Sequence, residues 1–183
     1  TGDSKCAKYS IDNILGCRDS FLTLPDPDFF DGCRMLHIAP ISHGSGMMLL
    51  PVLFSGGCTV TMNEPSLENW CRYIQQEKIS HAFIVPTLAY RLLEMPEARE
   101  YDLSSLRTVL YGAAPMSPAK AKLLVERFGS IFTQVYGSTE HLAATLCLSK
   151  KDHIVDAETE GRLASAGRRS TGIELSVCDD DGN

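Results

Sequence analysis

Short apolar stretches recur along most of the chain, and each is bounded by glycine or proline. They are rich in β-branched and aromatic residues, and none is long enough to form a typical helix. Continuous apolar runs of this kind are typical of strands that are buried on both faces of a parallel sheet. We therefore predict strands within residues 34–40, 57–62, 80–86, 106–112 and 131–137.

Two segments between these runs have the 3.6-residue period of an amphipathic helix. In residues 66–76, Ser66 is suited to cap the first turn. In residues 118–128, Ser117 is the expected N-cap and Gly129 the expected stop. The apolar positions that share one face are Leu67, Trp70, Cys71 and Ile74 in the first helix, and Ala121, Leu124, Val125 and Phe128 in the second.

Alternation of strands and helices predicts an α/β fold, with right-handed βαβ units and a mostly parallel sheet flanked by helices. The pattern changes after Leu148 to a polar stretch, followed by a predicted strand in residues 173–179. We expect residues 1–148 to form the central α/β subdomain. Residues 149–183 are expected to begin a less regular, β-containing segment.

Length and charge narrow the class of protein. A chain of 183 residues can bury roughly 70% of its unfolded surface, which suffices for a sizeable core. The formal charge is −6, without a basic cluster, which argues against nucleic acid or an anionic membrane as a partner. No apolar run approaches the ~18 residues of a membrane span.

The seven cysteines are scattered, and no two have the C-x-x-C spacing of a zinc or redox site. Free, mostly buried thiols in a reducing compartment are the natural interpretation, and we expect Cys58 and Cys147 to be buried. The chain is therefore expected to be cytoplasmic.

Candidate chemistry follows the predicted strands, because ligands of parallel sheets bind at the carboxyl ends of the strands. In "VYGSTEH", Gly137 permits a tight turn, and Ser138, Thr139 and Glu140 present two hydroxyls and a carboxylate. Hydroxyl and N–H donors suit phosphate oxygens, and a carboxylate suits Mg²⁺. The alternative is an ordinary turn or helix cap with a solvated Glu140.

A second candidate is the stretch "LYGAAPMS". Small residues after a strand let the backbone approach a flat ligand, and proline stiffens the turn before the helix. The alternative is a compact loop whose small residues serve strand-to-helix packing. The residues concerned are Gly112, Ala113, Ala114 and Pro115.

A third candidate is His43 in "APISHGSGMM", where the following apolar run could line an apolar pocket. A lone histidine is more often structural than catalytic. The stretch does not fit G-x-G-x-x-G or G-x-S-x-G, so dinucleotide-binding and esterase functions lose their main support. The opening "TGDSKCAKYS" is not a Walker loop either. That motif needs a glycine directly before the lysine and Ser or Thr directly after it, whereas Lys5 follows Ser4 and precedes Cys6. A disordered terminus is its alternative interpretation.

Taken in order, these motifs resemble those of the adenylate-forming (AMP-binding) superfamily, which includes acyl-CoA synthetases, luciferases and adenylation domains. "TGDSKCAKYS" is similar to the second half of that family's phosphate loop, with Thr1, Gly2 and Lys5 matching. "VYGSTE" matches Y-G-x-T-E, the most specific motif of the set. "ASAGRRSTGIELSV" resembles a later G-R-P-x-x-G-x-E segment, with Arg169 where proline is usual.

The resemblance implies an ATP-dependent, Mg²⁺-requiring acid–thiol ligase that forms an acyl-adenylate and passes the acyl group to coenzyme A. It implies that Thr139 contacts phosphate, Glu140 holds Mg²⁺, and His43 positions the acid. The implied nucleotide contacts are Thr1, Gly2, Lys5, Gly112, Ala113, Ala114, Pro115, Tyr136, Gly137 and Ser138.

The family's ribose-binding aspartate, hinge and lid lysine have no counterpart in these residues, nor does the first half of the phosphate loop. We therefore expect a central piece of a larger synthetase that is inactive alone, and whose partners are the remaining portions of its parent chain. Two alternatives stay open. One is an adenylation domain that passes the acyl group to a carrier-protein phosphopantetheine, and the other is a non-catalytic nucleotide- or acyl-binding module. An unrelated doubly wound domain with chance matches is the remaining hypothesis.

Overall fold

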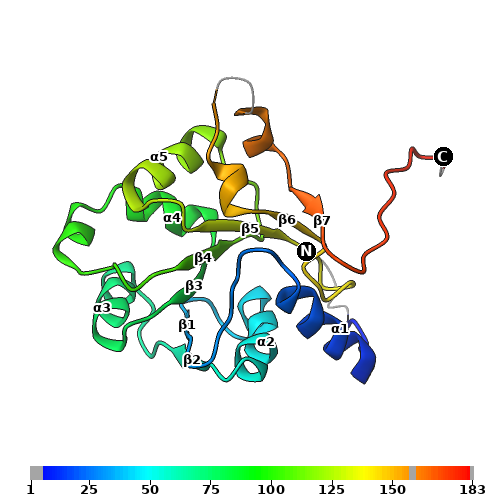
Figure 1. Ribbon diagram of the computed structural model, residues 1–183, viewed down its shortest axis with the longest axis horizontal. Helices are drawn as coiled ribbons and strands as arrows, with labels where there is room; N and C mark the ends of the chain where they lie inside the picture. The colour runs from blue at the N-terminus through cyan, green and yellow to red at the C-terminus, as the bar shows by residue number, and fades with distance from the viewer. Residues whose placement is uncertain (1–5, 157–159, 182–183) are drawn as a thin grey trace.

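A seven-stranded sheet forms the centre of the computed structural model, which describes residues 6–156 and 160–181 (Figure 1). The strand order is β2-β1-β3-β4-β5-β6-β7. Strands β1 to β5 are parallel, and β6 and β7 are antiparallel additions. This confirms the predicted α/β fold with a mostly parallel sheet. The strands are β1 Arg34–His37, β2 Cys58–Thr61, β3 His81–Ile84, β4 Thr108–Tyr111, β5 Phe132–Tyr136, β6 Leu146–Leu148 and β7 Arg168–Arg169.

Within residues 6–156 and 160–181, five α-helices and four short 3₁₀ helices precede or connect the strands. The helices α3 and α5 are the two that the sequence pattern predicts, and α5 begins and ends as expected. The pattern did not single out α1 or α4. The elements are α1 Ile11–Leu22, α2 Leu49–Phe54, α3 Leu67–Glu77, α4 Pro86–Leu93, α5 Pro118–Phe128, η1 Gly44–Met48, η2 Pro96–Glu100, η3 Lys150–His153 and η4 Glu160–Ala164.

Alternate strand residues contribute to two cores, one on each face of the sheet. In β4, Leu110 belongs to the core that contains α1 and α2 residues, whereas Val109 and Tyr111 belong to the core that contains α3, α4 and α5 residues. Figure 1 shows the same division, with α3 to α5 on one side of the strands and α1 and α2 on the other. Burial on both faces explains why the strand sequences are continuously apolar.

Local signals set the helix ends. At α1, Ser10 and Asn13 form a capping box, in which the Asn13 N–H donates to Ser10 Oγ. At α3, Ser66 caps the first turn by accepting from the Asn69 N–H. Ser117 occupies the N-cap of α5 without a side-chain cap, and its own N–H donates to the Tyr90 hydroxyl instead.

Two expectations are wrong. Residues 173–179 form no strand, and Val177 there is 93% exposed. A strand needs a hydrogen-bonded neighbour, and the pairing of β7 with β6 ends at Arg169. Cys58 is exposed rather than buried, because it lies in β2 at the edge of the sheet. Cys147 is buried as expected.

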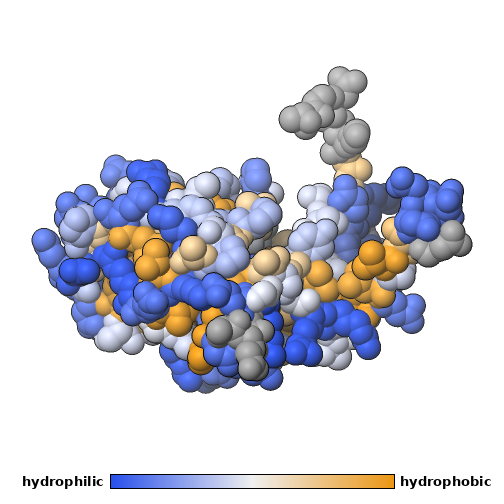
Figure 2. Space-filling model, turned by 90° about the horizontal axis from the view of Figure 1, so that it is seen from above, coloured by the Kyte–Doolittle hydropathy of each residue, from blue (hydrophilic) through white to orange (hydrophobic). Residues whose placement is uncertain are grey.

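The visible face of the surface is mostly polar (Figure 2). Figure 2 shows a mostly hydrophilic face on which apolar side chains gather in separate patches. Among the described residues, no helix is both long and apolar enough to cross a membrane.

His81, the first residue of β3, is fully buried between the sheet and the segment that precedes β1. Its Nδ1 lies 2.8 Å from Ser80 Oγ, and its Nε2 pairs with the carbonyl oxygen of Pro27. Burial lowers the pKa of His81 to about 4, although the bond to Pro27 acts in the opposite direction. The folded protein therefore holds this ring neutral.

This burial predicts a loss of stability in mild acid. Below the ordinary histidine pKa of about 6.5, His81 is protonated in the unfolded chain but stays neutral in the folded protein. The free energy of unfolding therefore falls as pH falls. We expect His81 alone to contribute a loss of about 2 kcal/mol between about pH 7.5 and about pH 5. Urea unfolding at both pH values measures it. His81→Gln should flatten the pH dependence, and a slope equal to that of the parent protein would contradict the assignment.

Candidate functional site

The loops that follow β1, β4 and β5 meet at one edge of the sheet. The strand register aligns their ends, since His37 pairs with Phe83 and Tyr111 pairs with both Ile84 and Gln134. Two pockets open at this edge, with volumes of about 740 Å³ and about 320 Å³. They have four lining residues in common: Ala113, Val135, Tyr136 and Gly137.

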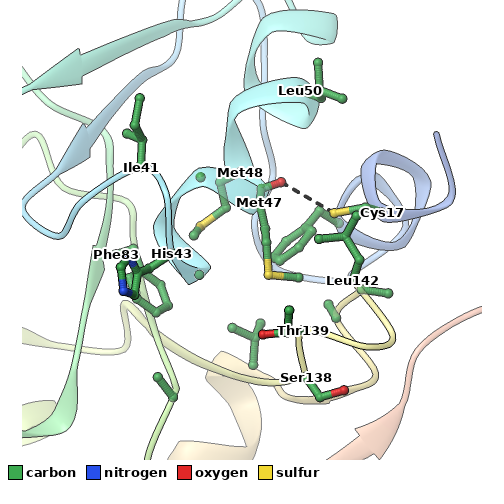
Figure 3. A pocket seen from close by; sticks show the side chains of 18 of the residues that line it. Cys17, Ile41, His43, Met47, Met48, Leu50, Phe83, Ser138, Thr139 and Leu142 are labelled. Atoms are coloured by element: carbon green, nitrogen blue, oxygen red, sulfur yellow. Dashed lines mark hydrogen bonds between the residues drawn. The ribbon is translucent and has the colours of Figure 1, made fainter. Parts of the chain in front are cut away.

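The larger pocket is apolar in its interior (Figure 3). Among the described residues, its lining contains no Asp, Glu, Lys or Arg. Cys17 lies in its wall, where the thiol donates to the Met47 carbonyl at 3.8 Å and burial raises the thiol pKa to about 11. The apolar lining residues are Ile14, Cys17, Phe21, Ile41, Met47, Met48, Leu50, Phe83, Ala113, Val135, Leu142, Ala143 and Ala144.

His43 lies at the polar rim of this pocket, directly before η1. Its exposed ring pairs with Ser42 Oγ at 3.0 Å through Nδ1. The turn that carries it is tight, because a Cβ at Gly46 would collide with the Ile41 carbonyl oxygen. In Figure 3, His43 lies beside Phe83, whereas Ser138 and Thr139 belong to another loop.

The loop 137–145 supplies the rest of the rim. It is closed by two local hydrogen bonds, since the His141 N–H donates to Ser138 Oγ at 3.3 Å and the Leu142 N–H donates to the Ser138 carbonyl at 3.0 Å. Thr139 and Glu140 occupy the turn and are exposed. The hydroxyls of Ser138 and Thr139 thus lie beside an apolar cavity, an arrangement that suits a ligand with an anionic head and an apolar body.

The smaller pocket is a narrow slot between the backbone of residues 113–116 and the end of β5, with residues 163–166 as its third wall. Gly112 makes the slot possible, because a Cβ there would collide with the Val135 carbonyl oxygen. Ala113 adopts the left-handed region with φ of 66°. Tyr136, half exposed, lines both pockets. A slot of backbone and small side chains beside an aromatic ring suits a flat heterocycle.

The described residues contain no group of three or more His, Cys, Asp or Glu that could enclose a metal ion. Glu140 alone offers a carboxylate on the turn that bears Thr139. Magnesium bound with a nucleotide usually takes one or two protein carboxylates and completes its shell with phosphates and water. The donor set therefore fits a magnesium ion that arrives with a nucleotide.

The structure brings together most of the residues that the sequence singled out. The larger pocket takes His43, Ala113, Tyr136, Gly137, Ser138 and Thr139, and the smaller takes Ala113, Ala114, Pro115, Tyr136 and Gly137. Gly112 lies buried behind the slot, and Glu140 lies on the exposed turn outside both linings. The predicted contacts Thr1, Gly2 and Lys5 lie outside the described residues.

Sequence reasoning missed the contribution of α1. Tyr9, Cys17 and Phe21 all line the larger pocket. The Ser10-x-x-Asn13 spacing could have revealed the start of a helix. Nothing in that local pattern indicates that one face of the helix closes a pocket against loops more than 100 residues further along the chain.

A pair of glycine substitutions tests the slot. We expect Gly112→Ala to lower the free energy of unfolding by about 1–3 kcal/mol, because the new methyl group must displace the end of β5. Gly16→Ala should instead raise it by about 0.5–1 kcal/mol, since Gly16 lies within α1 and a Cβ there meets nothing within 4 Å. Urea denaturation of both variants gives the comparison; a neutral Gly112→Ala would refute the close approach.

Comparison with protein families matches residues 1–183 to the model of the AMP-binding enzyme family. Among curated proteins, the chain is 33% identical over 149 residues to the medium/long-chain-fatty-acid–CoA ligase FadD8 of Mycobacterium tuberculosis, covering 81% of this chain and 25% of that protein. It is 37% identical over 144 residues to probable 4-coumarate–CoA ligase 2 of Dictyostelium discoideum, covering 76% of this chain and 26% of that protein. The chain thus spans about a quarter of the length of these relatives.

Solved structures with a similar fold were also found. The amide bond synthetase McbA of Marinactinospora thermotolerans superposes with a TM-score of 0.81 and 30% identity, over 93% of this chain and 33% of that one. The N-terminal domain of FACL13 of Mycobacterium tuberculosis gives a TM-score of 0.81 at 22% identity, over 96% of this chain and 42% of that one. The second match shows the shared fold.

Proposed function

Because the chain belongs to the AMP-binding enzyme family, we propose that it forms the floor of an adenylation site in an ATP-dependent acid–CoA ligase. The observation that carries this proposal is the pairing of an apolar pocket with a narrow slot, which meet at Tyr136 and Gly137. An acyl-adenylate has the same two parts, an acyl group and a flat base, joined through a phosphate. Ser138 and Thr139 line the larger pocket and directly follow Gly137 in the chain, so their hydroxyls are proposed to contact that phosphate.

The proposed reaction has two steps. In the first, a carboxylate oxygen of the acid attacks the α-phosphorus of ATP, the bond to the β-phosphate oxygen breaks, and pyrophosphate leaves. In the second, a thiolate attacks the acyl carbon, and the bond to the phosphate oxygen breaks to release AMP. Both steps place additional negative charge on oxygens near the phosphate or carbonyl. Fixed hydrogen-bond donors are therefore the main contribution that the protein can make.

The roles proposed for the rim residues follow from this need. The Thr139 hydroxyl donates a hydrogen bond to an oxygen of the α-phosphate, and Ser138 and the backbone N–H groups of the turn lie beside it. His43, on the other side of the larger pocket, orients the carboxylate of the acid. Glu140 would hold Mg²⁺, which supplies charge neutralisation to the phosphates when it is bound.

The slot is proposed to hold adenine. Ala113, Ala114 and Pro115 line one wall, and the absence of a side chain at Gly112 allows the loop to lie against β5. Tyr136 is proposed to stack on the base. The Gln134 side chain donates to the Ser165 carbonyl at 3.2 Å and links β5 to the third wall.

The acid is proposed to have an uncharged, apolar body. Burying an unpaired charge among Phe21, Met47 and Leu142 would be costly, because the described lining offers it no opposite charge. Curated relatives named for medium/long-chain fatty acids and for 4-coumarate are consistent with an acid of this kind.

Coenzyme A is the proposed acceptor, since FadD8 and probable 4-coumarate–CoA ligase 2 are both named as CoA ligases. A carrier-protein phosphopantetheine would accept the same acyl-adenylate. We further propose a cytoplasmic location, which suits seven cysteines that are all free.

Acid-dependent exchange of labelled pyrophosphate into ATP tests the first step. We expect the protein produced from its complete reading frame to catalyse exchange with at least one acid from a panel of fatty and aryl acids. Tight binding of an acyl-sulfamoyl adenosine without any exchange would instead indicate a non-catalytic binding module. Subsequent addition of coenzyme A or of a loaded carrier protein identifies the acceptor.

Thr139→Val should lower the exchange rate by about 10²–10³-fold, the usual effect of removing one donor to a developing charge. Thr87→Val, on exposed α4 surface, is the matched control and should retain the full rate. Pyrophosphate exchange at saturating ATP measures both variants. A Thr139→Val rate within twofold of the parent protein would rule out the proposed donor.

His43→Ala should slow adenylation by about tenfold or more, since a misplaced carboxylate attacks less often. The thermal unfolding midpoint should stay unchanged, because the His43 ring is exposed and bonds to its neighbour Ser42. Single-turnover formation of the acyl-adenylate gives the rate. An unchanged rate would remove His43 from the mechanism.

A further inference from the structure

Helix α1 and the residue before its cap make two hydrogen bonds to the loop 137–145. The Tyr9 hydroxyl donates to the carbonyl oxygen of Thr139, and the N–H of Ala144 donates to Ser20 Oγ at 3.2 Å. These bonds join segments 130 and 124 residues apart. In Figure 1, α1 and the loop that joins β5 to β6 lie next to each other.

From these contacts we infer that α1 braces the loop 137–145 and that Tyr9 is a positioning residue for Thr139. This inference rests on the proposed function, because Thr139 matters for catalysis only if the site forms an adenylate. It assigns a role to a residue that the sequence motifs did not single out.

The backbone next to Tyr9 is anchored to the rest of the domain. The adjacent Ser10 takes part in the capping box, in which its N–H donates to Asn13 Oδ1 at 2.9 Å. Further along α1, Cys17 and Phe21 are buried in the core shared with Met48. The start of the helix is therefore fixed to the body of the domain, and the phenol extends from a fixed point.

The bond at Thr139 controls the direction of a peptide group. A trans peptide is planar, and its C=O and N–H point in opposite directions. When Tyr9 holds the Thr139 carbonyl, the following N–H, that of Glu140, is directed away from Tyr9. The phenol thus fixes the orientation of one backbone donor in the turn that is proposed to contact phosphate.

The second bond fixes the other end of the loop. Ser20 is buried, and its hydroxyl donates to the Cys17 carbonyl at 2.7 Å while it accepts from Ala144. The loop is therefore attached to one helix near both of its ends. The same helix lines the larger pocket through Cys17 and Phe21, so the brace also fixes the spacing between the acyl pocket and the phosphate donors.

Tyr9→Phe tests the brace, because it removes the hydroxyl and keeps the ring that lines the pocket. Tyr73→Phe on α3 is the matched control, since Tyr73 packs against the core on the other face of the sheet. We expect Tyr9→Phe to lower kcat for pyrophosphate exchange about tenfold with KM for ATP and acid nearly unchanged, and to lower the thermal midpoint by only about 2–4 °C, as the loss of one ordinary hydrogen bond does in a chain of this size. Tyr73→Phe should leave kcat and KM at parent values.

Hydrogen–deuterium exchange supplies a readout that does not depend on activity. Peptides covering residues 137–145 should exchange about fivefold faster in Tyr9→Phe, as expected for the loss of one ordinary hydrogen bond. The same peptides in Tyr73→Phe should match the parent protein.

Unchanged exchange in residues 137–145 would overturn the brace, and faster exchange with an unchanged kcat would overturn the positioning role. A rise in KM alone would also contradict it, because that result indicates a lost binding contact rather than a misplaced donor. If the parent protein turns over no acid at all, the proposed function and the positioning role of Tyr9 in catalysis fail together. The exchange measurement then still decides whether Tyr9 holds the loop.

Discussion

Parallel pairing of β1, β3, β4 and β5 is the constraint on which the rest of the structure depends. Parallel strands end at the same edge of a sheet, so the loops after them must meet there whatever their distance in sequence. The ladder also requires helices on both faces, because each strand is buried on both sides. The site loops are therefore positioned by the two cores of the sheet, into which they themselves place Met48, Met116 and Ala144.

The division of the site into an apolar pocket and a backbone-lined slot follows from that arrangement. The loops after β1 and β5 enclose the pocket together with α1, whereas the loop after β4 lies against β5 to form the slot. Tyr136 and Gly137 belong to both because β5 ends between them. A ligand with an apolar part and a flat part, joined by an anionic group, matches this arrangement of pocket and slot. The proposed acyl-adenylate chemistry rests on that match and on membership of the AMP-binding enzyme family.

The parallel sheet, α3, α5 and most rim residues could be predicted from sequence, because short apolar runs, caps and turn residues act over a few positions. The failures involve tertiary context. Cys58 lies in an apolar run, but its strand is at the edge of the sheet, and residues 173–179 alternate like a strand without forming one. The pocket wall from Cys17 and Phe21, and the bond from Tyr9 to Thr139, depend on contacts between distant segments, for which one sequence carries no signal. The domain boundary after residue 148 stays a prediction.

The pocket and the slot are proposed to be two halves of one site. The most direct measurement is a crystal structure of the protein, produced from its complete reading frame, with a non-hydrolysable acyl-sulfamoyl adenosine. We expect the base to lie between Ala114 and Tyr136, the sulfamoyl group at Thr139, and the acyl chain against Met47 and Cys17. A base bound in the apolar pocket, or an acyl chain bound elsewhere, would contradict it.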